Sequence, residues 1–249
     1  MAIFTCNCPS LVLGHETRFN VYLPEYAEGD VKTIFLLHGM SDDSTTWFRS
    51  SNVGRYIRSH TAAIICPEGG LSFYTDMAYG EPFYSHITQE LIGQTRRMFH
   101  LSEKREDTFI AGISMGGYGA YSIALRNPEI FGGAASLSGA LDMCCEENLS
   151  DESNAPFFRS VWGDDYRNTL PGSDGDLFAL ADRLSKSGKP LPRLYQMCGT
   201  NDFLLEANRK FRDFIQGKGF EHVYSEPEGT HEWGLWDRVT PDVLNFFLG

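Results

Sequence analysis

The segment Asp107-Thr-Phe-Ile-Ala-Gly-Ile-Ser-Met-Gly-Gly-Tyr-Gly-Ala-Tyr121 decides the fold of this chain. Its first part, Thr108 to Ala111, is short, apolar and partly β-branched, which is typical of a buried strand. The small residues from Gly117 to Leu125 favour a helix. A Gly-x-Ser-x-Gly motif stands between the two, and in that context it predicts a nucleophile elbow with Ser114 at its tip.

The motif alone is a weak signal, because the chain contains 25 glycines. The strand before it and the helix after it carry the prediction. In such a turn a strained backbone lifts the serine hydroxyl above the sheet edge, and Gly112 and Gly116 allow strand and helix to approach closely. The helix N-terminus behind Ser114 also favours negative charge, which suits a developing oxyanion.

Length and charge narrow the class of protein. The chain has 249 residues and a net charge of -12. This length allows one large α/β domain, and we expect residues 1-249 to form a single domain because no linker or repeat interrupts them. An acidic chain without clusters of Lys or Arg is a poor binder of nucleic acid or anionic membranes. A small-molecule partner is expected instead.

The first residues and the cysteines indicate the cellular compartment of the protein. Residues 1–9 lack the basic start and apolar core of a secretory signal, so we expect a cytoplasmic protein. The six cysteines fit that location as free thiols. Neither the Cys6–Cys8 spacing nor the adjacent pair Cys144 and Cys145 has the spacing of a zinc site, so no metal is expected.

The hydrophobic pattern alternates between strands and helices along most of the chain, which predicts an α/β fold. We expect an antiparallel edge pair within Phe4–Pro24 and further strands at Thr33–Leu37, Thr61–Cys66, Thr108–Ala111, Gly132–Leu137, Arg193–Cys198 and Glu221–Glu226. We expect helices at Trp47–Arg58, His86–Phe99, Gly117–Leu125, Leu177–Ser185, Glu206–Gly217 and Thr240–Leu248.

A serine nucleophile needs a base, and the base needs an acid to hold its tautomer. With an elbow of this kind the chain order is Ser, then Asp or Glu, then His. His231 follows the last predicted strand, where the base is expected, whereas His222 lies at a strand start and is more consistent with a structural role. Asp202 follows the preceding strand and is preferred as the acid over Glu206, which falls within a helix.

Two backbone N–H groups are candidates for an oxyanion hole. The His38-Gly39-Met40 turn follows the third predicted strand, and such a turn supplies one donor while the residue after the nucleophile supplies the other. The expected donors are therefore Met40 and Met115. His38 itself precedes the serine in the chain, so a role in orienting the turn or in packing is favoured over a role as the base.

Two aromatic segments are candidates for the substrate pocket. One is the loop from Phe73 to Tyr84, which includes Tyr79. The other lies within residues 142-192, a stretch too long for a plain connection, which we interpret as a small cap inserted after the sixth strand. Its Phe157, Phe158 and Trp162 are candidate substrate-facing residues. Packing of either segment against the body of the protein is an equally good explanation for these aromatic side chains.

Five segments carry a family resemblance: Lys104–Ala120, Ser72–Asp76, Arg126–Pro128, Ala135–Ala140 and Gly199–Asp202. Together they resemble the esterase D-like family of the α/β-hydrolases, and within it the bacterial tributyrin (acetyl) esterases and the cinnamoyl/feruloyl esterases. The resemblance implies a mostly parallel central sheet with helices on both faces. It also implies a cofactor-free serine carboxylesterase that hydrolyses short-chain acyl (acetyl or butyryl) or hydroxycinnamoyl (feruloyl) esters.

Other activities remain open at this point. The wider family includes S-formylglutathione hydrolases and acyltransferases, and the same three residues would cleave a thioester. A non-catalytic protein with this fold is a further alternative, although such proteins typically lack one of the three residues. The exposed aromatic loop and the cap would suit a homodimer.

Overall fold

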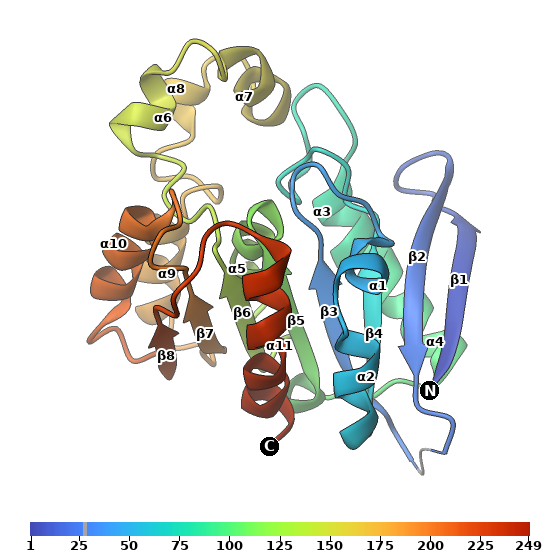
Figure 1. Ribbon diagram of the computed structural model, residues 1–249. Coiled ribbons are helices and arrows are strands. Elements are labelled where there is room, and N and C mark those ends of the chain that lie inside the picture. The colour runs from blue at the N-terminus through green and yellow to red at the C-terminus, as the bar shows by residue number, and fades with distance from the viewer. Residues whose placement is uncertain (27–28) are drawn as a thin grey trace.

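A mostly parallel sheet forms the centre of the molecule in the computed structural model, which describes residues 1–26 and 29–249 (Figure 1). Its order is β1-β2-β4-β3-β5-β6-β7-β8. The pairs β1–β2 and β2–β4 are antiparallel and the others are parallel. The strands are β1 Ala2–Pro9, β2 Glu16–Leu23, β3 Lys32–Leu37, β4 Ala62–Pro67, β5 Thr108–Ile113, β6 Gly133–Leu137, β7 Arg193–Met197 and β8 His222–Ser225.

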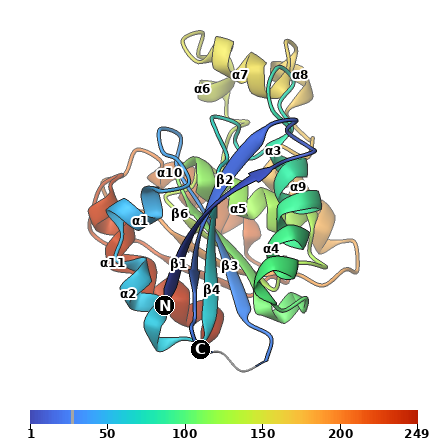
Figure 2. The same cartoon turned by 90° about the vertical axis from the view of Figure 1, so that its right-hand side faces the viewer.

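Helices cover both faces of the sheet. Successive side chains of a strand point to opposite faces, and both faces of the parallel strands are apolar, so each face must be buried. In β3, Ile34 and Leu36 join one core while Phe35 and Leu37 join the other. Figure 2 shows the sheet between the two helical layers. One layer holds α1 Thr46–Ser50, α2 Val53–Tyr56 and α11 Trp233–Leu248, and the other holds α4 Ile92–Phe99, α5 Met115–Arg126, α9 Leu177–Ser185 and α10 Leu205–Ile215. The predicted α/β fold is confirmed.

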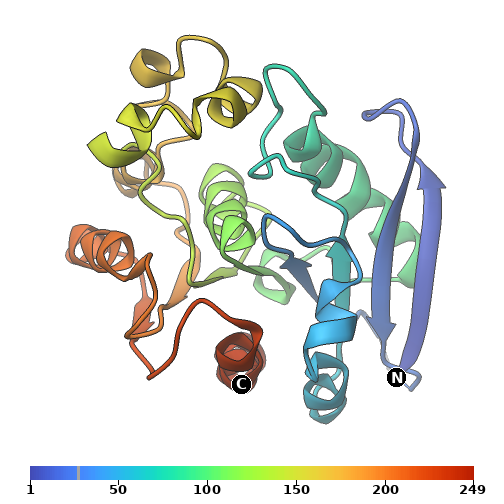
Figure 3. The ribbon, with the colours of Figure 1, turned by 45° about the horizontal axis from the view of Figure 1, so that its top comes forward.

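Three short helices lie beyond the carboxyl ends of the parallel strands (Figures 1 and 3). They are α6 Glu146–Ser150, α7 Ala155–Trp162 and α8 Tyr166–Thr169. The loop after β4 runs beside them, since the N–H groups of Ala78 and Tyr79 donate to the carbonyls of Val161 and Ser160 at 3.0 and 2.9 Å. The next helix, α9, returns to the sheet and packs on α5. The segment over the strand ends is therefore shorter than the expected 142–192.

One of the predicted helices is interrupted in the structure. The expected helix Trp47–Arg58 is broken into α1, α2 and the 3₁₀ turn η1 Ile57–Ser59. Ser51 is extended there, and the Asp237 carboxylate accepts hydrogen bonds from the Ser51 hydroxyl at 2.8 Å and from the Asn52 N–H at 2.6 Å. These bonds replace helical ones, which explains the break.

The closing helix begins at Trp233 rather than at the expected Thr240, and Pro241 lies inside it. An internal proline costs roughly 3 kcal/mol because it removes one hydrogen bond and crowds the preceding turn. The helix continues because one face is buried against the sheet through Leu235, Trp236, Val239, Val243, Leu244 and Phe247. Burying a large apolar side chain contributes about 1.5–3 kcal/mol, so this face outweighs the proline.

The helix expected at His86–Phe99 is present but irregular. It begins as α3 Phe83–Ser85, continues as the π-helical segment η2 His86–Leu91 and ends as α4, after which the 3₁₀ turn η3 Arg105–Asp107 leads into β5. Within residues 1–26 and 29–249, none of the helices combines the length and the apolar character needed to cross a bilayer.

Candidate active site

Ser114 occupies the sharp turn between β5 and α5. Its backbone angles are φ 53° and ψ -117°, a region that non-glycine residues rarely adopt. The turn closes tightly: a Cβ atom on Gly112 would lie 2.2 Å from the carbonyl oxygen of Gly116. One on Gly116 would lie 2.6 Å from the carbonyl oxygens of Leu37 and His38. Only glycine fits at either position, as the elbow motif requires.

Three loops bring a hydroxyl, an imidazole and a carboxylate together at this turn. His231 lies between β8 and α11, and its Nε2 is 3.0 Å from the Oγ of Ser114. Its Nδ1 is 2.9 Å from Oδ2 of Asp202, which lies between β7 and α10. The carboxylate is fully buried and its Oδ1 also accepts from the N–H of Leu204 at 2.9 Å. This arrangement can transfer a proton from the serine to the histidine.

The Asp202 carboxylate is held in its charged form. Burial alone would raise its pKa, but hydrogen bonds from His231 and from the Leu204 N–H stabilise the anion and bring the pKa below its usual value. A buried anion beside Nδ1 keeps the proton on that nitrogen, so Nε2 faces Ser114 as an acceptor. Glu206, the alternative acid, pairs with Arg209 at 2.8 Å on the exposed side of α10.

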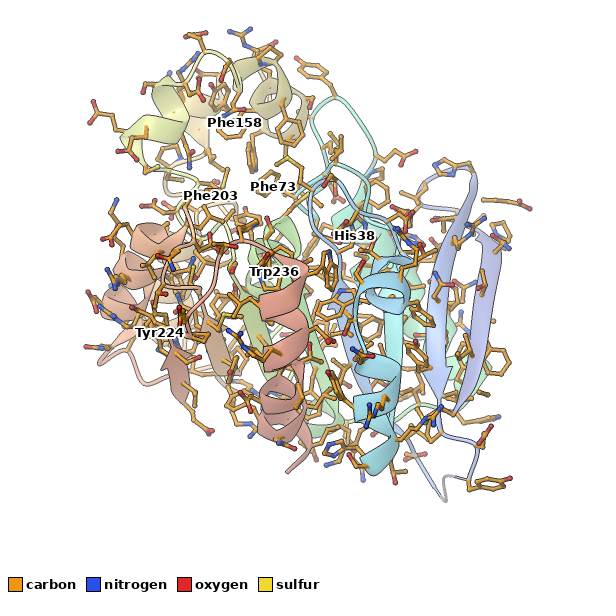
Figure 4. All side chains as sticks on the ribbon, in the orientation of Figure 1. His38, Phe73, Phe158, Phe203, Tyr224 and Trp236 are labelled. Carbon is orange, nitrogen blue, oxygen red and sulfur yellow. The ribbon has the colours of Figure 1, made fainter. Side chains whose placement is uncertain are left out.

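Two aromatic rings hold the imidazole of His231. The ring of Phe203 lies 4.6 Å from it between centroids, and the ring of Trp236 lies 4.9 Å away and perpendicular to it. The indole N–H of Trp236 donates to the Ser138 hydroxyl at 3.0 Å, which fixes that ring. Figure 4 shows Phe203 and Trp236 at the carboxyl edge of the sheet, from the loop after β7 and the first turn of α11. Both restrict rotation of the imidazole.

The two expected oxyanion donors lie on either side of Ser114. Met115 is the first residue of α5, so its N–H lacks an acceptor within the helix. Met40 follows a turn held by His38, whose Nδ1 donates to the Gly39 carbonyl at 2.8 Å. The hydroxyl of Tyr74 donates to the His38 carbonyl at 2.9 Å. Both methionines line the same cavity as Ser114.

A cavity of about 640 Å³ opens over Ser114 and His231. Its walls are mostly apolar, and Figure 4 shows Phe158 from α7 and Phe73 from the loop after β4 beside it. Phe157, an expected substrate-facing residue, is among the lining residues. The loop that begins at Phe73 contributes Phe73 to the wall, whereas the sequence reasoning missed four other lining side chains: Met143, Phe203, Trp233 and Trp236. Phe203 directly follows Asp202 in the sequence, and this position could have identified it as a residue of the cavity wall.

Two expected pocket residues do not line this cavity. Trp162 packs behind it, against the rings of Phe73 and Phe158 at 5.2 and 5.1 Å. Tyr79 is 63% exposed and donates its hydroxyl to Asp164 at 2.8 Å. The expectation that they face substrate is therefore wrong for this cavity. Both side chains instead join the loop after β4 to the segment of α6–α8.

The fold and the serine turn define the class of this protein, an α/β-hydrolase of the serine hydrolase type. The model of the esterase family described as "Putative esterase" matches residues 10–245. The chain belongs to this family, and it is a carboxylic ester hydrolase.

Similar proteins with known sequences or structures agree with this class. The acetyl esterase of Caldicellulosiruptor saccharolyticus is 34% identical over 262 residues, which cover 99% of this chain and 98% of that protein. A substrate-bound structure of the Staphylococcus aureus serine hydrolase FphF has a TM-score of 0.91 at 30% identity and covers 100% of this chain and 98% of that one. The S. aureus S-formylglutathione hydrolase FrmB has a TM-score of 0.88 at 31% identity, with coverage of 100% and 99%.

Proposed function

We propose that this esterase hydrolyses short-chain acyl or hydroxycinnamoyl esters through an acyl-enzyme on Ser114, with His231 as base and Asp202 as acid. The observation that carries the proposal is the 3.0 Å contact between His231 Nε2 and Ser114 Oγ at a strained turn. A serine hydroxyl is a weak nucleophile at neutral pH, and a neutral imidazole at this distance can remove its proton during attack.

The reaction proceeds in two halves. Ser114 Oγ attacks the ester carbonyl while its proton passes to His231, and the N–H groups of Met40 and Met115 stabilise the oxyanion. The imidazolium, stabilised by Asp202, gives that proton to the leaving alcohol, and an acyl-serine remains. Water then attacks the acyl group, its proton passes to His231, and collapse of the second tetrahedral intermediate returns the proton to Ser114 and releases the acid.

The proton transfer fixes how a substrate lies. His231 protonates the leaving oxygen, so the alcohol portion of the ester lies on the His231 side of the cavity, beside Phe203. The acyl portion then faces the other wall, where Phe157, Phe158 and Phe73 supply an apolar surface. A cavity of about 640 Å³ has the size typical of small-molecule sites and accepts either an acetyl or an aryl acyl group.

The test is a comparison of kcat/KM for p-nitrophenyl butyrate, methyl ferulate and S-formylglutathione, with Ser114→Ala as the blank. The acetyl esterase relative supports the short acyl group. If butyrate leads and ferulate is inert, the enzyme is a short-chain esterase. If ferulate is cleaved at least as well, the aromatic wall binds an aryl acyl group. A thioester that leads by several orders of magnitude would support the alternative suggested by the similarity to FrmB.

Two further proposals concern the setting of the enzyme. We propose that it acts in the cytoplasm, which is supported by free thiols at all six cysteines. We also propose a homodimer, for which the supporting feature is exposed apolar surface such as Ile3 and Leu71. Cell fractionation tests the first, and sedimentation velocity tests the second.

A further inference from the structure

The charges on the cavity wall are all of one sign. Asp42 and Glu232 line the cavity together with Ser114. Lys and Arg are absent from its wall, counting residues 1–26 and 29–249. Within the same ranges, neither carboxylate has an ion-pair partner or a side-chain hydrogen bond. Among the described residues, the cavity wall therefore carries two carboxylates and no Lys or Arg side chain to compensate them.

The two carboxylates come from two different loops that line the cavity, the one after β3 and the one before α11. Glu232 directly follows His231, on the side where the leaving alcohol must be protonated. Asp42 lies by the oxyanion turn, with its Oδ2 3.2 Å from the position that a Cβ atom of Gly39 would occupy. An alcohol portion that lies on the His231 side is therefore next to Glu232, and Asp42 belongs to the wall of the same cavity.

We infer that this cavity selects esters by the charge of the alcohol portion: cationic alcohols are preferred to neutral ones, and anionic alcohols are rejected. The inference rests on the proposed ester hydrolysis at Ser114. A charged alcohol portion interacts with these carboxylates more strongly in a partly enclosed site than it would in water, because the surrounding dielectric is lower. The net charge of -12 adds a long-range contribution of the same sign.

The same reasoning bears on the thioester alternative. A glutathione thioester carries two carboxylates and one ammonium group on its thiol portion, which is therefore anionic overall, and this portion leaves on the His231 side. Proteins that bind such groups usually offer Arg or Lys to them. The lining described here offers two carboxylates instead. The cavity therefore favours neutral or cationic alcohol esters over anionic thiol esters.

The test uses three phenyl acetates that differ only in a remote charge. Each ring carries, at the end of a two-methylene chain, a carboxylate, a carboxamide or a trimethylammonium group, so the reactivity of the ester bond is nearly constant. We expect kcat/KM at low ionic strength to rise about tenfold from the anionic to the neutral ester and a further severalfold to the cationic one. Added salt at about 0.5 M should compress this series, since it screens exposed charges.

Variants locate the cause of the selectivity. The double variant Asp42→Asn with Glu232→Gln should bring the three kcat/KM values within about twofold of one another. The matched control, Asp30→Asn with Glu129→Gln, removes the same charge from exposed positions outside the cavity and should keep the wild-type ratios. The ratios of kcat/KM between the three esters are compared within each variant, so a loss of overall activity does not change these ratios.

The outcomes separate this inference from the proposed function. Hydrolysis of all three esters that depends on Ser114 but shows no charge order would overturn the inference and leave the esterase proposal intact. A charge order that survives in the double variant would also overturn it. If Ser114→Ala cleaved the esters as fast as the wild type, the proposed mechanism would be wrong, and the inference with it.

Discussion

Replacing Asp202 with asparagine should reduce kcat by about 10⁴ while leaving the protein folded. The structure shows how the substitution acts. Oδ1 of Asp202 accepts from the backbone N–H of Leu204 at 2.9 Å, and Nδ1 of His231 lies nearer to Oδ2, at 2.9 Å, than to Oδ1, at 3.1 Å. Asparagine has only one oxygen, and the Leu204 N–H cannot become an acceptor. The amide oxygen must therefore face Leu204, and the amide NH₂ must face His231.

This orientation places the imidazole proton on the wrong nitrogen. An NH₂ group donates, so Nδ1 of His231 becomes an acceptor and the proton moves to Nε2. Nε2 lies 3.0 Å from Ser114 Oγ, and once protonated it cannot remove the serine proton. The loss of about 10⁴ corresponds to about 5 kcal/mol of transition-state stabilisation, at 1.36 kcal/mol for each factor of ten.

The assay is steady-state hydrolysis of p-nitrophenyl butyrate, with the active fraction counted by a fluorophosphonate probe. Asp213→Asn is the matched control: it makes the same chemical change on α10, where the exposed carboxylate pairs with Arg212 at 2.7 Å, and it should keep wild-type kcat. Thermal unfolding checks that both variants fold. If Asp202→Asn kept more than a tenth of wild-type kcat, the assignment of the acid and the argument from Leu204 would both be refuted.

Three further predictions concern stability and packing. Gly116→Ala should destabilise the protein by about 2–3 kcal/mol in chemical unfolding, because its Cβ would meet two carbonyl oxygens at 2.6 Å, whereas Gly234→Ala, with open space around it, should not. Burial of His222 lowers its pKa to about 4, below the usual 6.5, so the unfolded chain binds the extra proton. Stability should therefore fall by about 2 kcal/mol as pH falls from about 6.5 to about 4, and His222→Asn should remove that slope; an unchanged slope contradicts the assignment. Trp162→Phe should change stability by under about 1 kcal/mol and leave KM unchanged, because its buried indole N–H has no partner among residues 1–26 and 29–249 and its ring lies outside the cavity; a raised KM would place the ring at the substrate.

The strands and the serine turn were predictable because local sequence determines them. Buried parallel strands such as β3 and β5 are short apolar runs, and the elbow needs glycine at Gly112 and Gly116 for steric reasons that do not depend on the rest of the fold. The positions of Asp202 and His231 followed from chain order and from the rule that functional loops lie at the carboxyl ends of parallel strands. Their mutual distances required the structure.

The cavity wall was harder to predict, because tertiary contacts determine it. The helix α11 begins at Trp233, ahead of its internal proline, and the later start expected from sequence concealed the role of Trp236 beside His231. Of the aromatic residues of α7, Phe157 and Phe158 line the cavity and Trp162 packs behind it. Composition alone gives the same expectation for Phe157 and Trp162. Only their packing partners show which of the two faces the cavity.

Four non-glycine residues with positive φ lie around the serine site, while a fifth, His100, ends α4, and the four link the stability of the molecule to its chemistry. Ser114 and Ser138 follow neighbouring strands, and both have positive φ angles, of 53° and 49°. Phe73 and Tyr74 share this conformation, and the turn they form brings the Tyr74 hydroxyl to the His38 carbonyl. Each such residue costs on the order of 1–3 kcal/mol, which the buried cores on both faces of the sheet must offset. Relaxing any of these turns would stabilise the chain locally, but it would also move a group that holds the nucleophile, the histidine or the oxyanion turn.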